Sequence, residues 1–333
     1  MPALPHAAPH NGTEPLGARH GASPRAATDR TPDRTPDRTL VALIGQLGGG
    51  ERMCTSLAEY VLAPNQADLV LMIDAPREGE GGEGASSAYR ACLARARHVW
   101  TLPEPSDWSE PMDAIAATLG ASGWRGVANR TGRVGFLGPA RVVAGSSVRS
   151  PSTGGVRLVY RHMLKQRLLL HGLVGRYSRF VLTRADHVYG CAHDVRALDL
   201  RHHVYIPRGE DNGGVNDGHM VCGRAHVLSC LSILEGPLLH PERYVDRDEL
   251  RPEAFLKLRL QELALWARVR RTPRVMFLAS AESGGDAASL FHTLRAFPEP
   301  AAAGQQVTHG RDRLPTDRAC TRSHACSHTG FPP

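Results

Sequence analysis

The chain has 333 residues, of which 41% are hydrophobic and 22% charged, and its formal net charge at pH 7 is +7. That length suits one large domain or two ordinary ones. Nearly all of the positive charge is arginine scattered along the chain, and aromatic residues make up only 5%, so the composition argues against a nucleic-acid-binding protein and favours an anionic ligand such as a sugar nucleotide.

Targeting signals and cysteines bear on the compartment. No run reaches the roughly 18 apolar residues of a transmembrane helix, and residues 1–39 lack the apolar core of a signal peptide. The seven cysteines form no regular framework, and five lie in or beside apolar runs, where free cysteine behaves as a small hydrophobe. We therefore expect a cytoplasmic protein in a reducing compartment, and peripheral association with a membrane stays open.

Both ends of the chain are polar and lack apolar periodicity. Residues 1–39 and 299–333 cannot bury enough apolar surface to offset their ordering entropy, so we expect disordered tails around one folded domain, 40–298. The C-terminal tail also holds four residues whose spacing does not match the common zinc-finger patterns. They are Cys320, His324, Cys326 and His328.

Between the tails, strand and helix patterns alternate. This order predicts an α/β domain with a mixed, mainly parallel sheet flanked by helices. The expected strands are 40–47, 67–74, 98–102, one within 176–190, 202–209, 219–222 and a closing strand at 274–280. The expected helices are 52–63, 86–97, 106–119, 154–177, 224–239 and 251–265. We expect helix 154–177 to pack under the strand that follows it, through Val159, Leu164, Leu168 and Leu169.

The stretch RYSRFVLTRADHVYG (176–190) combines a buried strand with two charged residues at its end. Alternate side chains of a strand share a face. The residues expected on one face are Phe180, Leu182, Arg184 and Asp186. A face that begins apolar and ends in a charged pair suggests a strand that passes through the core and ends in a pocket. A structural ion pair at the strand end is the alternative.

A glycine run follows the first expected strand. Gly48–Gly50 ends the strand and opens the next helix, which brings main-chain amides and a helix N-terminus to the carboxyl end of the sheet. Such a place suits a phosphate group. The run is neither a G-x-G-x-x-G nor a Walker motif, and a tight turn without a ligand explains it equally well.

The loop GEDNGGVND supplies three carboxylates, Glu210, Asp211 and Asp217. Carboxylates near strand ends can hold a hard divalent cation that bridges a diphosphate. A solvated turn is the alternative for Glu210 and Asp211, and a cap on the next segment is the alternative for Asp217. His187 and His219 lie beside these carboxylates in sequence and are acid/base or metal-ligand candidates, with a structural role as the alternative.

The order of these parts resembles that of GT-A-type glycosyltransferases, in particular proteins similar to the WavE lipopolysaccharide-synthesis family. The most specific segments are TRAD and GEDNGGVNDGHMVCG. The resemblance covers about 40–280 and rests on LVALIGQLGGGERMCTSLAEYVLAPNQADLVLMI, HVWTLPEPSDWSEPMDAI, YSRFVLTRADHVY, HHVYIPRGEDNGGVNDGHMVCGRAHV and RPEAFLKLRLQELALWARVRRTPRVMF.

This resemblance implies a single GT-A-like, Rossmann-type domain with a donor side and an acceptor side. On the donor side, the residues expected near the nucleotide are Gln46, Gly48, Gly49 and Gly50. Arg184 and Asp186 are expected at the diphosphate, with Asp186 holding Mn²⁺ or Mg²⁺. On the acceptor side, Asp217 is expected as base or orienter, together with Glu210 and Asp211.

The chain departs from the family pattern at two positions. A strict D-x-D is absent, because the RAD step supplies only Asp186 as a carboxylate. Gly48 stands where relatives are expected to carry an arginine. The first departure bears on metal dependence and the second on affinity for the diphosphate.

We therefore expect a glycosyltransferase that moves a hexosyl group from a nucleotide-sugar donor to a glycan or other hydroxyl acceptor. A positive partner for the leaving diphosphate and one carboxylate base would meet the needs of such a reaction. The alternatives are a catalytically silent nucleotide- or carbohydrate-binding module and a metal-dependent phosphoesterase that uses the same carboxylates.

Overall fold

The structure is a computed structural model, and it describes residues 37–45, 49–74, 89–103, 105, 109–130, 153–244 and 251–278. All of these residues belong to one compact unit of the chain, Thr35–Pro333. Gln46, Gly48, most of the predicted N-terminal tail and the whole predicted C-terminal tail, with its Cys/His group, lie outside the described residues.

A seven-stranded mixed sheet forms the centre of the fold, in the order β3-β2-β1-β4-β7-β6-β8. Strands β3, β2, β1 and β4 are parallel, β7 is antiparallel to both of its neighbours, and β8 is parallel to β6. The predicted α/β class with a mainly parallel sheet is confirmed. The strands are β1 (Thr39–Gly45), β2 (Asp68–Asp74), β3 (Ala96–Leu102), β4 (Arg179–Arg184), β6 (Val204–Pro207), β7 (His219–Gly223) and β8 (Val269–Thr272).

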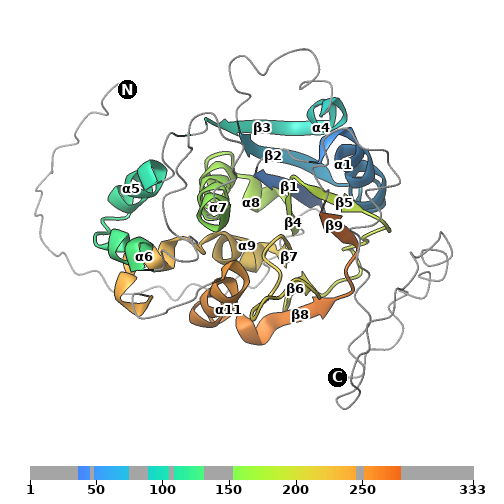
Figure 1. The fold of residues 1–333 in the computed structure, drawn as a ribbon. Helices are drawn as coiled ribbons and strands as arrows, with labels where there is room; N and C mark the ends of the chain where they lie inside the picture. The colour runs from blue at the N-terminus through green and yellow to red at the C-terminus, as the bar shows by residue number, and fades with distance from the viewer. Residues whose placement is uncertain are drawn as a thin grey trace, which may run out of the picture. The chain divides into compact units, whose positions relative to one another are not determined.

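Helices cover both faces of this sheet (Figure 1). Leu40 and Phe180 point into the core on the α7 side, whereas their neighbours Val41 and Val181 point into the core on the α1 side. Strands buried on both faces read as continuous apolar runs, which is why β1 and β4 show so little alternation. The helical segments are α1 (Gly50–Leu57), η1 (Ala58–Leu62), α2 (Ala63–Asn65), α4 (Arg90–Arg95), α5 (Ser109–Thr118), α6 (Trp124–Arg130), α7 (Thr153–Leu170), α8 (Leu173–Arg176), α9 (Arg224–Leu231), α10 (Glu235–Leu239), η2 (Pro241–Arg243), α11 (Pro252–Glu262) and η3 (Trp266–Arg268).

Two predicted helices are interrupted. The segment predicted as helix 154–177 is divided into α7 and α8 at Gly172, whose φ of 60° is left-handed and ends the first helix. The segment 224–239 likewise forms α9 and α10. Of the four residues expected to pack α7 under β4, Val159, Leu164 and Leu168 are fully buried, but Leu169 is 46% exposed and that prediction is wrong.

The C-terminal strands also differ from expectation. β9 (Met276–Leu278), predicted as a closing strand of the sheet, pairs instead with β5 (His187–Tyr189) in a separate antiparallel ribbon. The edge of the sheet is instead formed by β8, whose sequence VRRT carries too much charge to stand out as a strand. Charged edge strands resist pairing with other chains, which gives this composition a structural reason.

Cysteine pairing is a second correction. Cys54 on α1 and Cys92 on α4, both 1% exposed, form a disulfide, so the reading of these two as free hydrophobic cysteines is wrong. Cys222 and Cys230, both buried, are free thiols. Among the described residues, no helix combines the length and the apolar character needed to cross a membrane.

The disulfide should contribute strongly to stability, because it closes a loop with a sequence separation of 38. Loss of a cross-link of that length costs about 4 kcal/mol on the chain-entropy estimate. Urea unfolding of the wild type should shift to a lower midpoint in dithiothreitol. The Cys54→Ala/Cys92→Ala variant should start from the lower midpoint and show no further response. Equal urea midpoints for the wild type with and without dithiothreitol would contradict a stabilising disulfide.

Candidate functional site

The order of the strands gives the sheet a switch point, the place where open α/β sheets form their binding crevice. From β1 the chain adds β2 and then β3 toward one edge, and later returns to place β4 on the other side of β1. Helix α1, which follows β1, and helix α7, which precedes β4, cover opposite faces of the sheet, so the direction in which strands are added reverses between β1 and β4. In open α/β sheets, ligands bind at such a switch point, which makes this edge of the sheet the first candidate for a site.

The turn after β1 supplies backbone to the crevice. Gly49 immediately precedes α1, and a Cβ built on it would lie 2.5 Å from Met53 Cβ and 3.5 Å from Asp186 Cα. Gly45 and Gly50 have φ of 104° and 61°, a region that glycine reaches without strain. Glycine is required at Gly49 because the turn packs closely against Met53 of α1, and the same turn lies at ordinary contact distance from the segment that follows β4.

Arg184 and Asp186 meet at the end of β4. The strand ends at Arg184, and Asp186 lies in the following turn, so the predicted alternation does not extend to Asp186. Arg184 nevertheless donates from Nε to Asp186 Oδ1 at 2.8 Å and from Nη2 to Oδ2, forming a bidentate pair. Burial alone would raise the pKa of Asp186, but the Arg184 guanidinium outweighs burial and lowers it. Their side chains keep 27% and 25% exposure, so solvent reaches the pair.

The beginning of β7 adds a second charged group. Because β7 is antiparallel to β4, it starts where β4 ends, and the Arg184 amide donates to the Gly218 carbonyl at 3.1 Å. A Cβ on Gly218 would lie 2.8 Å from Arg184 Cδ, so glycine makes room for this guanidinium. Asp217 accepts from Arg157 of α7 at 2.7 Å, and its carbonyl accepts from the buried Arg161.

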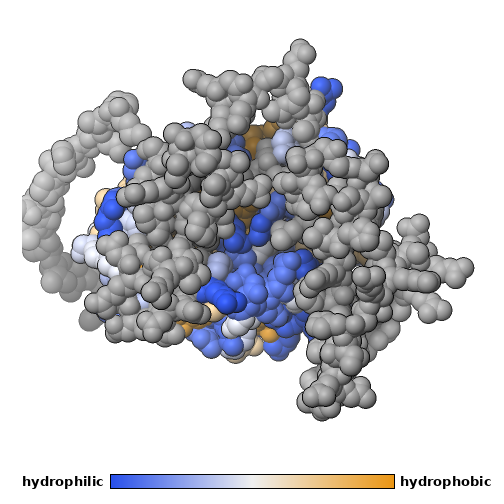
Figure 2. Space-filling model, viewed as in Figure 1, coloured by the Kyte–Doolittle hydropathy of each residue, from blue (hydrophilic) through white to orange (hydrophobic). Residues whose placement is uncertain are grey.

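The loop between β6 and β7 carries the remaining candidates. Glu210 pairs with Arg274 at 2.6 Å, and Asp211 pairs with Arg271 at 2.7 Å. Glu210 adopts a left-handed φ of 54°, a strained conformation of the kind that clusters at functional sites. Figure 2 shows hydrophilic residues gathered in the region where Figure 1 places β6 and β7.

Long-range charge effects show that these pairs form one cluster. Arg184 interacts electrostatically with Asp217 and Glu210 as well as with Asp186, and Asp186 interacts with Arg157. The predicted site residues that the structure brings together are Gly49, Arg184, Asp186, Glu210, Asp211 and Asp217. Asn216 supports the loop, because its Oδ1 accepts from the Gly218 amide at 2.9 Å and the His219 amide at 3.2 Å.

Sequence reasoning identified Arg184 but missed the other four arginines of this cluster. Arg157 and Arg161 stand four residues apart on α7, a spacing that puts both on one helix face and could have indicated their common role. Arg271 and Arg274 lie in and after β8 and showed no distinctive pattern. The cluster therefore contains five arginines: Arg157, Arg161, Arg184, Arg271 and Arg274.

A chain of buried polar side chains lies beside the cluster. The Thr183 hydroxyl is 3.3 Å from His187 Nδ1 and 2.8 Å from the Tyr189 hydroxyl, which is 3.2 Å from His219 Nδ1. His219 Nε2 is in turn 3.2 Å from His193 Nε2. Burial, followed by repulsion from Arg184, lowers the pKa of His187 to about 3, and burial lowers that of His219 well below its usual value. Both imidazoles are neutral at pH 7.

The donor set does not fit a divalent cation. Both Asp186 oxygens accept from Arg184, and the other three candidate carboxylates each have an arginine partner. Within the described ranges, no group of three or more His, Cys, Asp or Glu side chains is arranged to hold a metal ion. The binding of Mn²⁺ or Mg²⁺ at Asp186 stays a prediction.

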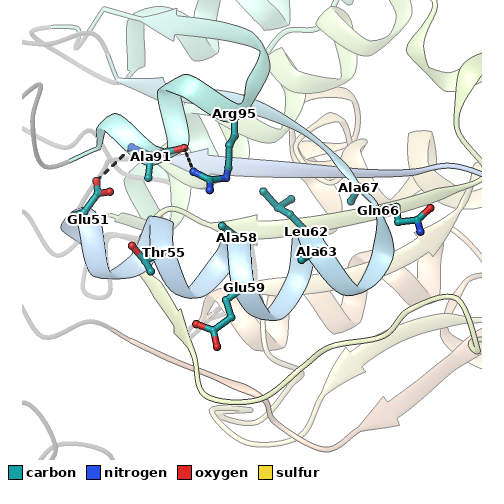
Figure 3. Close-up of a pocket in the computed structure, with 10 residues that line it drawn as sticks. All are labelled: Glu51, Thr55, Ala58, Glu59, Leu62, Ala63, Gln66, Ala67, Ala91 and Arg95. Atoms are coloured by element: carbon teal, nitrogen blue, oxygen red, sulfur yellow. Dashed lines mark hydrogen bonds between the residues drawn. The ribbon is translucent and has the colours of Figure 1, made fainter.

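A hollow of about 740 Å³ lies elsewhere, along the outer side of α1, η1 and α4 (Figure 3). Its wall includes Glu51, Glu59 and Arg95, and its remaining lining is largely alanine and leucine. None of the candidate site residues lines it.

Comparison with known proteins adds no family assignment. No family model matches the chain, and a search of curated proteins found no match.

The neutral histidines predict how stability depends on pH. Their folded-state pKa values lie below the unfolded value of about 6.5, so below that pH the unfolded chain binds more protons and the free energy of unfolding falls. Between about pH 6.5 and 5, each should remove up to about 1.4 kcal/mol per pH unit. When the free energy of unfolding is measured by urea at several pH values in this window, it should fall less steeply with decreasing pH for His187→Gln than for wild type. Parallel slopes for His187→Gln and wild type would be the contrary result.

Proposed function

We propose that this chain is a GT-A-type glycosyltransferase, with its nucleotide-sugar donor bound in the crevice between the ends of β1 and β4. The observation that carries the proposal is the meeting, at one topological switch point, of the glycine turn at Gly49, the pair Arg184–Asp186 and the carboxylate Asp217. These are the parts that the resemblance to WavE-like proteins assigns to donor and acceptor. Hexosyl transfer to a glycan or other hydroxyl acceptor is the reaction that this set of residues serves best.

Arg184 is assigned to the leaving diphosphate. Departure of the nucleotide builds negative charge on its phosphate oxygens, and a fixed positive group placed beforehand lowers the barrier without reorganising. The guanidinium is held in place by Asp186 and has room because residue 218 is glycine. The Gly49 turn supplies a backbone surface that a phosphate can approach closely. Gln46 and Gly48 belong to the same proposal and lie outside the described residues.

Asp217 is assigned to the acceptor as general base or orienter. Its side chain is 13% exposed and pairs with Arg157, whose own side chain is 19% exposed. A hydroxyl that enters the crevice could share the carboxylate with Arg157, and the carboxylate could then take the hydroxyl proton as the glycosidic bond forms. Glu210 and Asp211, which are more exposed, border the acceptor side in this proposal.

A second function has one observation in its favour. Each candidate carboxylate already has an arginine partner, which is what a purely structural set of ion pairs would also look like. This favours the alternative of a catalytically silent nucleotide- or carbohydrate-binding module. Turnover of a donor distinguishes the two functions, because a silent module binds the nucleotide and releases no product.

The test is release of nucleoside diphosphate from a panel of uridine, guanosine and cytidine diphosphate sugars, with water or added glycans as acceptor. Asp217→Asn should lower turnover about 100-fold or more, since general base catalysis contributes roughly that much. It should leave the melting temperature nearly unchanged, because the amide oxygen can still accept from Arg157. The matched control is Asp194→Asn, at an exposed aspartate paired with Arg196.

Full activity in Asp217→Asn would remove this residue from the reaction. Wild-type protein that binds the donors and releases no product with any of them would favour the silent module.

A further inference from the structure

We propose that the diphosphate of the donor is held directly by arginine side chains, with Arg184 exchanging Asp186 for phosphate, and that no divalent cation takes part in binding it. This inference rests on the proposed function and deepens it. It also reverses the sequence-based expectation of Mn²⁺ or Mg²⁺ at Asp186.

The charge of the cluster is the first support. Five arginines face four carboxylates, and the adjacent His187 is neutral, so the cluster carries one excess positive charge. The excess arises from Arg161, which is 7% exposed and donates to a main-chain carbonyl in place of a carboxylate. Arginine keeps its charge in proteins. The resulting field favours an anion and opposes a divalent cation.

The state of the carboxylates is the second support. A hard cation needs several oxygen ligands at once, but each carboxylate of the cluster is already paired with a guanidinium. A cation at Asp186 would have to displace Arg184, and the displaced positive charge would remain beside it. An arriving phosphate takes the Arg184 donors from Asp186, and the displaced carboxylate stays within reach of solvent and of the positive charge of Arg157.

The geometry of Arg184 is the third support. Its Nε and Nη2 both point at one carboxylate, the fork arrangement that matches two phosphate oxygens equally well. The side chains of Arg184 and Asp186 are each about a quarter exposed, so a ligand can reach the pair from solvent. Asp186 lies in the turn after β4, so a change of its side-chain rotamer need not alter the hydrogen bonds of the strand. Arg157 and Arg274 are also partly exposed and can contribute in the same way.

Direct and metal-bridged binding give opposite results for one substitution. If a cation bridges Asp186 to the diphosphate, Asp186→Asn must weaken binding, because the amide lacks the charge that the cation needs. If Asp186 competes with the diphosphate for Arg184, the same variant removes the competitor and must tighten binding.

The chain offers a matched control for this experiment. Arg196 donates from Nε and Nη2 to the two oxygens of Asp194, also two residues away, at 3.0 Å each. This pair is nearly half exposed, and Arg196 interacts electrostatically with Asp37, which precedes β1 and so belongs to the opposite end of that strand from the cluster. Asp194→Asn and Arg196→Gln therefore repeat the chemistry of the test variants outside the proposed site.

The measurement is isothermal titration of the full chain with inorganic pyrophosphate and with uridine diphosphate, in EDTA and then in Mn²⁺, beside thermal melts. We expect binding of the same strength in both buffers. Arg184→Gln should weaken it about tenfold or more, as expected for loss of charged hydrogen bonds. Arg184→Lys, which keeps the charge and the fold but loses the fork, should also weaken it. Asp186→Asn should tighten it, and both control variants should bind as wild type.

Binding that requires Mn²⁺, or that is weakened by Asp186→Asn in folded protein, would overturn this inference and leave the glycosyltransferase proposal standing. If normally folded protein binds neither pyrophosphate nor uridine diphosphate, in EDTA or in Mn²⁺, both this inference and the glycosyltransferase proposal would be overturned.

Discussion

Strand β4 is the constraint on which the arrangement of the molecule depends. It is hydrogen-bonded to β1 on one side and to β7 on the other, and apolar cores cover both of its faces. A charged side chain within such a strand would be buried without solvent, at a cost of several kcal/mol. Charge can therefore enter only at the two ends of the strand, at Arg179 where it begins and at Arg184 where it ends. The edge at Arg184 receives the turn after β1 and the start of β7, so three separate parts of the chain deliver their polar groups to one place.

Pairing by arginine explains how so many charges are tolerated there. Ions that are partly removed from water need close partners of opposite charge and further hydrogen bonds, and the planar guanidinium supplies both. The pairs Arg157–Asp217 and Arg184–Asp186 each satisfy a carboxylate that also faces solvent. Such pairs fix the positions of the side chains before a ligand binds. Each pair also exposes one cation and one anion, and a substrate can bind to either.

The apolar strands could be predicted from sequence, because burial on both faces leaves continuous hydrophobic runs such as those of β1 and β4. The edge strand β8 could not, because its position beside β6 depends on tertiary pairing and its sequence is charged. At the site, Arg184, Asp186 and Asp217 could be found from their places beside strand ends. Their arginine partners could not be assigned, because α7 and β8 approach the cluster only once the chain has folded. The disulfide was missed for the same reason.

The most direct test of the central claim is a crystal structure of the chain soaked with a nucleoside diphosphate. We expect phosphate oxygens within hydrogen-bonding distance of the Arg184 guanidinium, about 3 Å, in the crevice between the ends of β1 and β4. Ligand density confined to another part of the surface, such as the hollow along α1, with the Arg184–Asp186 pair undisturbed, would contradict it.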